Sequence, residues 1–175
     1  MNESLDMLGA SIIGGGILLM LLMVSLNFNS KTQETKLSEI SQLSIVSVGK
    51  ILSNDFNKLG YRASGNKILS INDSSISFLG DVNNDGNVDT VIYSTYHQGN
   101  ELELKRYLGN TQNSFWTFPV KNIEIKGIDS TGSSTFSINS IKGISFSIEL
   151  SQKTLSNSQA NIGSYWKRIF YPKNL

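Results

Sequence analysis

The feature that most constrains this chain is an uncharged N-terminal segment, which extends from Met7 to Ser30 and reads MLGASIIGGGILLMLLMVSLNFNS. A helix needs about 20 predominantly apolar residues to cross the hydrocarbon core of a bilayer. A core helix of a soluble domain would be shorter and would carry a polar face. The segment therefore predicts a transmembrane helix over residues 7–30, preceded by a short N-terminal flank at residues 1–6.

A cleaved secretory signal is the alternative interpretation of this segment. Such a signal has basic residues before its apolar core and a cleavage site with small side chains after it. Here the flank carries Glu3 and Asp6, and LNFNS is a poor cleavage site, so we favour an anchor that stays in the membrane. Gly14, Gly15 and Gly16 lie inside this anchor, where glycines let a second helix approach closely, although glycine is also simply common in membrane helices.

The helical pattern continues beyond the apolar segment through residues 31–60. Apolar residues recur there at spacings of mostly three or four and form one stripe, which consists of Leu37, Ile40, Ile45, Val48, Leu52, Phe56 and Leu59. Gly60 follows and suits the C-terminal cap of a helix. One helix from about Ser4 to Leu59 would be roughly 80 Å long at 1.5 Å per residue. Its first half would lie in lipid, and its second half would pack on a globular domain.

After Tyr61 the apolar periodicity changes to two, which is typical of strands. The alternating segments are KILSI, SISFL, VDTVIYSTY, ELELKRYL, SFWTF, NIEIKGI, TFSINSI, ISFSIEL and SYWKRIFY. Clusters of Gly, Asn, Asp and Ser separate them, as expected for turns. We expect one antiparallel sheet over residues 61–175, with the apolar stripe of the long helix covering its buried face; an additional layer formed by a hairpin is the alternative. The expected fold class is therefore α+β.

The loop at residues 81–92 carries the densest set of oxygen-bearing side chains in the chain. The candidate ligands, which mostly alternate along the loop, are Asp81, Asn83, Asp85, Asn87 and Asp89. Gly86 provides a sharp turn between them, as in the first part of a calcium loop, where a hard cation collects six to eight oxygens. Asn87 would offer its backbone carbonyl, and Asp89 would bind directly or through water. The alternative is an ordinary hydrophilic turn, because Asn, Asp and Gly are common turn residues.

This loop differs from an EF-hand at its end. Ile92 stands where an EF-hand has a bidentate glutamate, and a strand pattern follows in place of a helix. We therefore expect a Ca²⁺ loop set between two strands, with Val88 as the apolar residue that fixes the loop to the core. The ion would be structural rather than catalytic.

Composition excludes several function classes. The chain has no cysteine, a net charge of +1 and one histidine, His97, so neither disulfide chemistry nor a bulk attraction to nucleic acid is expected. The sequence contains no GxSxG, HExxH or phosphate-loop motif. We expect no enzymatic activity, no nucleic-acid partner and no small-molecule substrate.

Several strings in the chain resemble segments of the type IV pilins and the pseudopilins of type II secretion, in particular the larger minor-pilin type. LSNDFNKLGYR, at the predicted helix end, resembles the dlR-aGY segment of that group. ISFLGDVNNDGNVDTVIYST resembles its strand, acidic turn and vtY strand, and ELELKRYL takes the place of the following L-R strand. VKNIEIKGI and the closing YPKNL also resemble its later segments. The glycine followed by FTLxE, at which the family is processed, is absent.

The resemblance implies a long helix packed on an antiparallel sheet and assembly with other pilin-like subunits through the N-terminal helix. Glu3 and Asp6 are the acids near the position of the family's conserved glutamate, and one of them would offset the amino terminus of an adjacent chain. The resemblance also implies a single-pass protein of the bacterial inner membrane with its C-terminal domain outside the cytoplasm. A stand-alone, tethered, calcium-dependent surface-binding module of the adhesin type is the alternative function.

Overall fold

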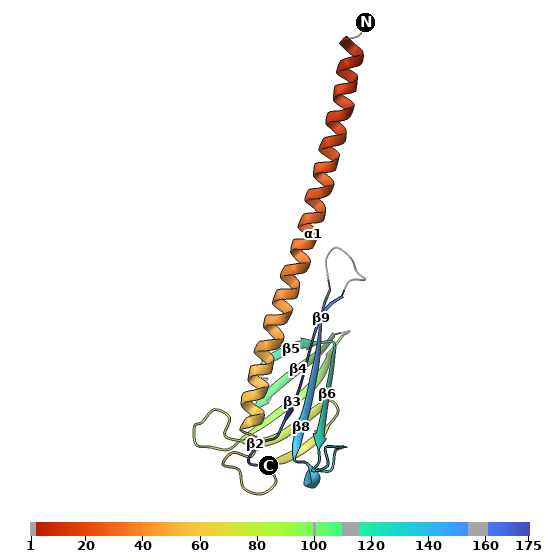
Figure 1. Cartoon of the computed structure of the whole chain (residues 1–175). Coiled ribbons are helices and arrows are strands. Elements are labelled where there is room, and N and C mark those ends of the chain that lie inside the picture. Colours follow the sequence, from red (N-terminus) through yellow and green to blue (C-terminus); the bar gives the residue numbers. More distant parts are fainter. Residues whose placement is uncertain (1–2, 100, 110–115, 154–160) are drawn as a thin grey trace.

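A computed structural model describes residues 3–99, 101–109, 116–153 and 161–175 of the chain. Its dominant element is one uninterrupted helix, α1 (Glu3–Asn57), of 55 residues. The N-terminal half of α1 projects away from the rest of the protein, and the C-terminal half lies against the strands (Figure 1). By length and composition α1 could cross a membrane, and its most apolar stretch is entirely unburied. The predicted continuity of the apolar and amphipathic segments is therefore confirmed.

The C-terminal half of α1 buries most of the predicted stripe. The buried positions are Ile45, Val48, Leu52 and Phe56 in α1 and Leu59 in the turn that follows it. Ile40 does not belong to the stripe, because its side chain is 51% exposed while Ser41 is fully buried. Each residue advances about 100° around a helix, and Ser41 is the position in phase with Leu52. Ser41 shares a hydrogen bond of 2.8 Å with Ser164, so a polar contact extends the buried face here.

The helix ends two residues earlier than predicted. The amides of Lys58 and Leu59 donate to the carbonyls of Asp55 and Phe56, three residues back, at 3.1 and 3.3 Å. This tighter turn replaces the last α-helical bonds, as is common at helix ends. Gly60 then takes a φ of 76°, the left-handed conformation expected of a capping glycine.

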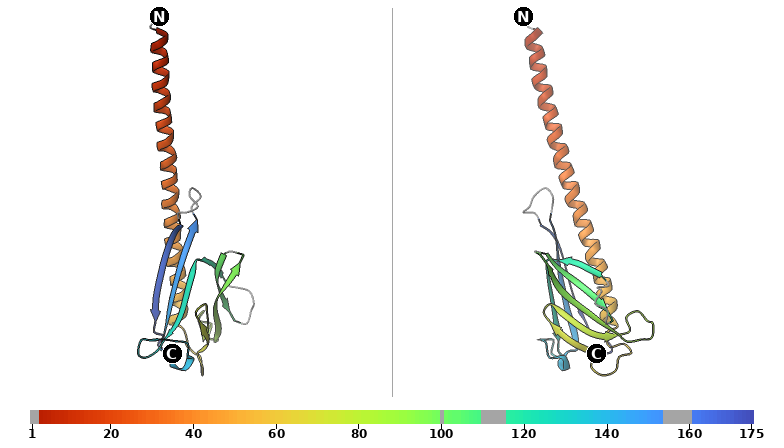
Figure 2. Two further views of the ribbon diagram at one scale, coloured as in Figure 1. Left: turned by 90° about the vertical axis from the view of Figure 1, so that its right-hand side faces the viewer. Right: turned by 180° about the vertical axis from the view of Figure 1, so that it is seen from behind.

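The strands form two antiparallel sheets. The first contains, in chain order, β1 (Ile68–Asn72), β2 (Ser75–Gly80), β3 (Asp89–Gln98), β4 (Glu101–Leu108) and β5 (Trp116–Val120). The second has the order β7-β6-β8-β9 and contains β6 (Asn122–Ile128), β7 (Ser134–Thr135), β8 (Gly143–Lys153) and β9 (Asn161–Phe170). Both sheets lie alongside the C-terminal half of α1 (Figure 2). The α+β class is as predicted.

Two details of the predicted sheet are wrong. The strands divide into two sheets rather than one, because alternation identifies the residues that face a core but not the neighbours of each strand. In addition, TFSINSI is not a strand: after β7 it forms a 3₁₀ turn, η1 (Ile138–Ser140). Here Phe136 and Ile138, the alternating apolar pair of the segment, are 47% and 37% exposed, so the alternation does not mark a face that packs on the core.

Phe56 of α1 lies at the centre of the core between the two sheets. Its ring lies within 5.0–5.8 Å, centroid to centroid, of four other aromatic rings, those of Phe78, Tyr93, Phe146 and Phe170. The first two belong to the first sheet and the last two to the second. The helix thus fills the space between both sheets, and each sheet depends on it for cover.

We predict that Phe56→Ala lowers the free energy of unfolding by about 3–5 kcal/mol, because the cavity it leaves is enclosed on several sides. Urea unfolding of the full chain in detergent micelles, followed by tryptophan fluorescence, measures this loss. Leu43→Ala is the matched control on the same helix, since Leu43 is 70% exposed, and it should change stability by less than about 0.5 kcal/mol. Equal losses in both variants would contradict a core centred on Phe56.

Candidate functional site: the acidic loop at the end of the helix

The acidic loop connects β2 to β3 and lies beside the last turn of α1. Three hydrogen bonds hold it there. The Lys58 side chain donates to the carbonyl of Val82 at 2.6 Å. The Asp81 amide donates to the carbonyl of Tyr61 at 3.2 Å, and the Gly60 amide donates to the carbonyl of Leu79 at 2.7 Å. Gly80 makes this approach possible, because a Cβ atom there would lie 2.4 Å from the carbonyl oxygen of Lys58. The loop and the helix end therefore form one unit.

Side-chain oxygens fold the loop by accepting bonds from its own backbone. The Asp85 amide donates to Oδ1 of Asn83 at 3.0 Å, and the Asn87 amide donates to Oδ1 of Asp85 at 2.7 Å. The Gly86 amide, at a φ of 94°, donates to Oδ2 of Asp81 at 3.1 Å. These bonds are turn-forming contacts of the kind that Asn and Asp favour. They bend the chain so that Asp81 and Gly86 lie next to each other.

The carboxylates of the loop differ in how many charged and hydrogen-bonding partners they have. Asp81 is fully buried, and its Oδ2 is 3.1 Å from the Arg62 guanidinium, which is half exposed. Oδ1 of Asp81 and Oδ2 of Asp89 are both buried and have no hydrogen-bond partner. Burial, and then the charges of Asp85 and Asp81, raise the pKa of Asp89. The bond from the Asn87 amide lowers the pKa of Asp85 despite partial desolvation.

These observations bear on whether the loop could hold a cation. Burying an unpaired carboxylate oxygen costs free energy, and the repulsion felt by Asp89 shows that three acids lie within electrostatic reach of one another. However, in the described part of the chain no three Asp, Glu or His side chains are already gathered in a metal-binding arrangement. Asn83 and Asn87 are exposed at the loop surface. A bound ion would therefore require the loop oxygens to leave some of their present partners.

The residue that fixes the loop to the core was predicted wrongly. Val88 is 42% exposed, whereas Val82 is 4% exposed and belongs to the core. The reason is strand parity. Val82 continues the buried alternation of Ile76, Phe78 and Gly80, and Val88 is out of phase with the buried residues of β3.

A buried ionic network, which the sequence patterns did not identify, includes Arg106, which lies near enough to Asp89 of the loop to act on its charge. Oδ2 of Asp55 accepts bonds from the Tyr93 hydroxyl and from Nε of Arg106, both at 2.6 Å. These side chains come from α1, β3 and β4 and are almost fully buried. Burial and the Asp55 charge raise the pKa of Tyr93 well above its usual value. Burial alone would lower the pKa of the Arg106 guanidinium, but the hydrogen bond and charge of Asp55 more than offset this effect, and the pKa is raised.

A signal for this network was present in the sequence. Asp55 falls on the apolar stripe of the helix, next to Phe56. Arg106 lies on the same, core-facing side of β4 as Leu102, Leu104 and Leu108. One acid and one base, each at a core position of a different element, predict a buried pair. The same carboxylate joins the helix to the first sheet.

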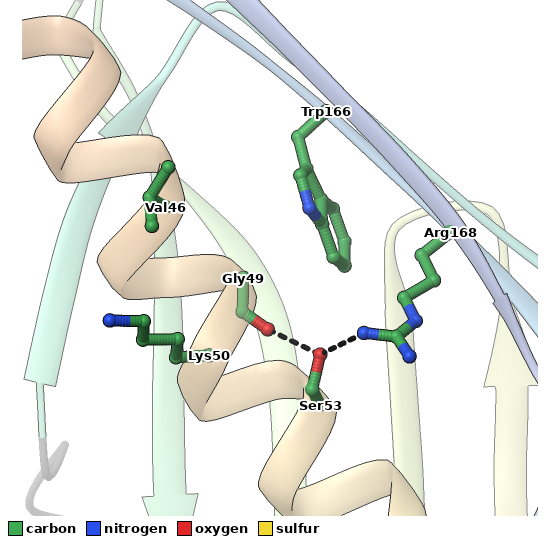
Figure 3. Close-up of a pocket in the computed structure, with 6 residues that line it drawn as sticks. All are labelled: Val46, Gly49, Lys50, Ser53, Trp166 and Arg168. Carbon is green, nitrogen blue, oxygen red and sulfur yellow. Dashed lines mark hydrogen bonds between the residues drawn. The ribbon is translucent and has the colours of Figure 1, made fainter.

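A groove of about 320 Å³ lies between α1 and β9 (Figure 3). The Trp166 ring lies over Gly49, where a Cβ atom would be 2.9 Å from the indole nitrogen. Arg168 donates to Oγ of Ser53 at 3.0 Å, and that hydroxyl donates to the carbonyl of Gly49 at 2.6 Å. Gly49 therefore permits close packing of the helix on the second sheet.

The predicted assembly residues lie far from the loop, at the other end of α1 (Figure 1). Glu3 and Asp6 are exposed in the first helical turns. At Gly14, Gly15 and Gly16, apart from the adjoining residues and backbone of α1 itself, no atom lies within 4 Å of the position that a Cβ would take. The two sets of predicted site residues thus form two separate regions, an N-terminal helix surface and a loop at the helix end.

Comparisons of this chain with protein-family models, with curated proteins and with solved structures give no match.

We predict that Asp55→Ala lowers the free energy of unfolding by about 3–5 kcal/mol, because it leaves the Arg106 charge buried without its carboxylate. The double variant Asp55→Leu/Arg106→Leu should lose less than Asp55→Ala alone, since both charges are then removed. Urea unfolding of the full chain in micelles measures each value. The control is Lys121→Ala, which breaks an exposed ion pair with Glu149 and should cost less than about 1 kcal/mol. A double variant that is the least stable of all would contradict this account.

Proposed function

We propose that this protein is a membrane-anchored structural or accessory subunit of a pilin-like fibre, of the type IV pilus or type II secretion kind, and that it has no catalytic role. The observation that carries the proposal is the single helix that leads without interruption from an apolar, unburied segment into the core of the globular domain. A tethered binding module needs only a flexible linker after its anchor. A rigid helical stalk is instead expected of a subunit whose anchor and globular domain must keep a fixed distance and orientation relative to each other.

The surface of the helix supports assembly with other pilin-like subunits in the membrane. The surfaces of Gly14, Gly15 and Gly16 are open, and in lipid such residues let two helix backbones approach closely. Glu3 and Asp6 are free to pair with the amino terminus of a neighbouring chain, and an acid near the membrane is costly without such a partner.

Exposed apolar residues also continue along α1 beyond the predicted membrane segment. Ile40, Leu43 and Val46 are 51%, 70% and 50% exposed, and their spacing of three places them along one side of the helix. Contact with a neighbouring chain would bury this surface.

Calcium is the proposed ligand of the acidic loop, with a structural role. The support is the pair of buried, unpartnered oxygens on Asp81 and Asp89 and the mutual repulsion of the loop acids. With few carboxylates and no bidentate glutamate, the dissociation constant should be about 10⁻⁴–10⁻³ M, as in extracellular modules. Such a site would stay empty in the cytosol.

This affinity bears on the orientation of the chain, which we propose to be a single pass through a bacterial inner membrane with the globular domain outside. Lys31 and Lys36 follow the apolar segment, and the positive-inside rule taken alone would place the domain in the cytoplasm. Only two lysines are involved, however, and Glu34 and Glu39 are interspersed with them. A loop that is filled only at millimolar calcium favours the outside.

We predict that replacing Gly14, Gly15 and Gly16 with leucine leaves membrane insertion intact but lowers the yield of cross-linked oligomers in native membranes several-fold, because the bulkier side chains keep helices apart. The control replaces Met20, Met23 and Val24 with leucine, three exposed positions on the same helix that already carry large side chains. If the full-length protein is found alone in the membrane with or without the glycines, the assembly role is wrong.

We predict that trypsin added to intact spheroplasts cleaves the chain beyond Lys31, for example at Arg62, whose side chain is 49% exposed. The cleavage follows from a domain that lies outside the membrane. Immunoblotting against the C-terminus measures the loss of full-length chain, and an intact cytoplasmic marker protein is the control. Protection of the domain until the membrane is lysed would contradict both the orientation and the calcium role.

A further inference from the structure

Arg62 is the cation that meets the acidic loop in this structure. Its Nη1 atom is 3.1 Å from Oδ2 of Asp81 and 3.2 Å from the position that a Cβ on Gly86 would take. The guanidinium therefore lies over the glycine turn, where the first and sixth residues of the loop meet. No motif in the sequence singled out this residue.

The backbone holds Arg62 in this position. Its φ of 61° is left-handed, a conformation that residues with a side chain rarely adopt. The preceding carbonyl, that of Tyr61, accepts the bond from the Asp81 amide at 3.2 Å. The turn after α1 is thus tied to the first residue of the loop, and the side chain of Arg62 starts directly beside it.

Arg62 compensates the loop incompletely. Oδ1 of Asp81 and Oδ2 of Asp89 stay buried without a hydrogen-bond partner while Oδ2 of Asp81 has both Arg62 and the Gly86 amide. A guanidinium is a planar fork that reaches outward-facing oxygens in its own plane. A calcium ion is compact and gathers oxygens from several directions at about 2.3–2.6 Å. The loop therefore has oxygens that suit an ion and that Arg62 leaves unused.

We propose that calcium binding to this loop displaces Arg62 from Asp81, so that Arg62 sets the affinity and occupancy of the site. The proposal rests on the calcium role given above. Two cations on one carboxylate repel each other, and this repulsion is strong where one side is buried. The Arg62 side chain is half exposed, and its guanidinium already lies 5.4 Å from the centre of the Tyr61 ring, so it could leave Asp81 for solvent without losing this aromatic contact. Arg62 thus acts as a built-in competitor that offsets the charge of Asp81 when calcium is scarce.

The test is calorimetric titration of calcium into the full chain in detergent micelles. Arg62→Gln should lower the dissociation constant about tenfold, because the competitor is gone. Arg168→Gln is the matched control: it removes the same charge from an exposed position at the groove with α1, and it should change the constant by less than twofold. An unchanged or weaker affinity in Arg62→Gln would overturn the proposal, since Arg62 would then be neutral or helpful to binding.

Thermal unfolding of the same variants separates displacement from a general charge effect. In chelator, Arg62→Gln should unfold at a lower temperature than the natural chain, because Asp81 has lost its guanidinium. In saturating calcium the two should unfold alike, because the bound state no longer uses that contact. An equal loss in both conditions would show that Arg62 stays on Asp81 when calcium is bound, and would overturn the proposal.

The failure of this inference is distinguishable from failure of the proposed function. Asp89→Asn, which leaves Asp81 and Arg62 in place, should weaken calcium binding at least tenfold. If neither the natural chain nor Arg62→Gln shows a calcium heat or a thermal shift, the calcium role and the competitor role of Arg62 both fall. The assembly role is tested separately, by cross-linking through the glycine surface, and does not depend on that result.

Discussion

The globular domain depends on the burial of one face of α1 between two sheets. Neither sheet could stand alone in water, because each presents an apolar face that needs cover. Leu52 and Phe56, both fully buried, supply much of that cover, and each side chain of this kind contributes about 1.5–3 kcal/mol when it leaves water. The aromatic rings around Phe56 come from both sheets, so the helix joins them as well as covering them. Strand pairing within each sheet then fixes the remaining geometry.

Electrostatics at the end of the helix follows from this packing. Placing α1 in the core also buries Asp55, which requires Arg106 and the Tyr93 hydroxyl as partners. Arg106 in turn lies close enough to Asp89 for its charge to oppose the rise in the pKa of that carboxyl. Because the loop backbone is bonded to the turn that follows α1, the acidic loop, the helix end and the buried network are neighbours in one charged region.

Much of this fold could be predicted from the sequence, because period alone distinguishes helix from strand. The spacing of Leu52 and Phe56 predicted the buried helix face, and the alternation of Ile144, Phe146 and Ile148 predicted a core strand, β8. The division into two sheets could not be predicted, since alternation carries no information on which strands are neighbours. The pairing of strands within each sheet, such as β6 with β8, decides that arrangement, and the bond from the Ile125 amide to the Asp73 carbonyl links the two sheets.

For the candidate site the sequence predicted the residue types of the loop but not their partners. Asp81 and Asp89 were identified as ligand candidates from their spacing, whereas Arg62 approaches them through a left-handed turn that no local pattern encodes. Val88 was predicted to fix the loop to the core, but Val82 is the buried residue. The alternation of buried residues in β2 indicates Val82, because it has the same parity as they do. The calcium role of the loop stays a prediction.

The absence of a break in α1 has a geometric consequence. A continuous α-helix rotates by about 100° and rises by about 1.5 Å with each residue, so the number of residues between Ser30 and Ile45 fixes the angle of the globular domain about the helix axis, relative to the apolar N-terminal segment. One inserted residue between them would leave both the apolar segment and the domain intact, yet it would turn the acidic loop through more than a quarter of a revolution about the helix axis. A partner that contacts both the apolar N-terminal segment and the globular domain would therefore bind only one length of the connecting helix.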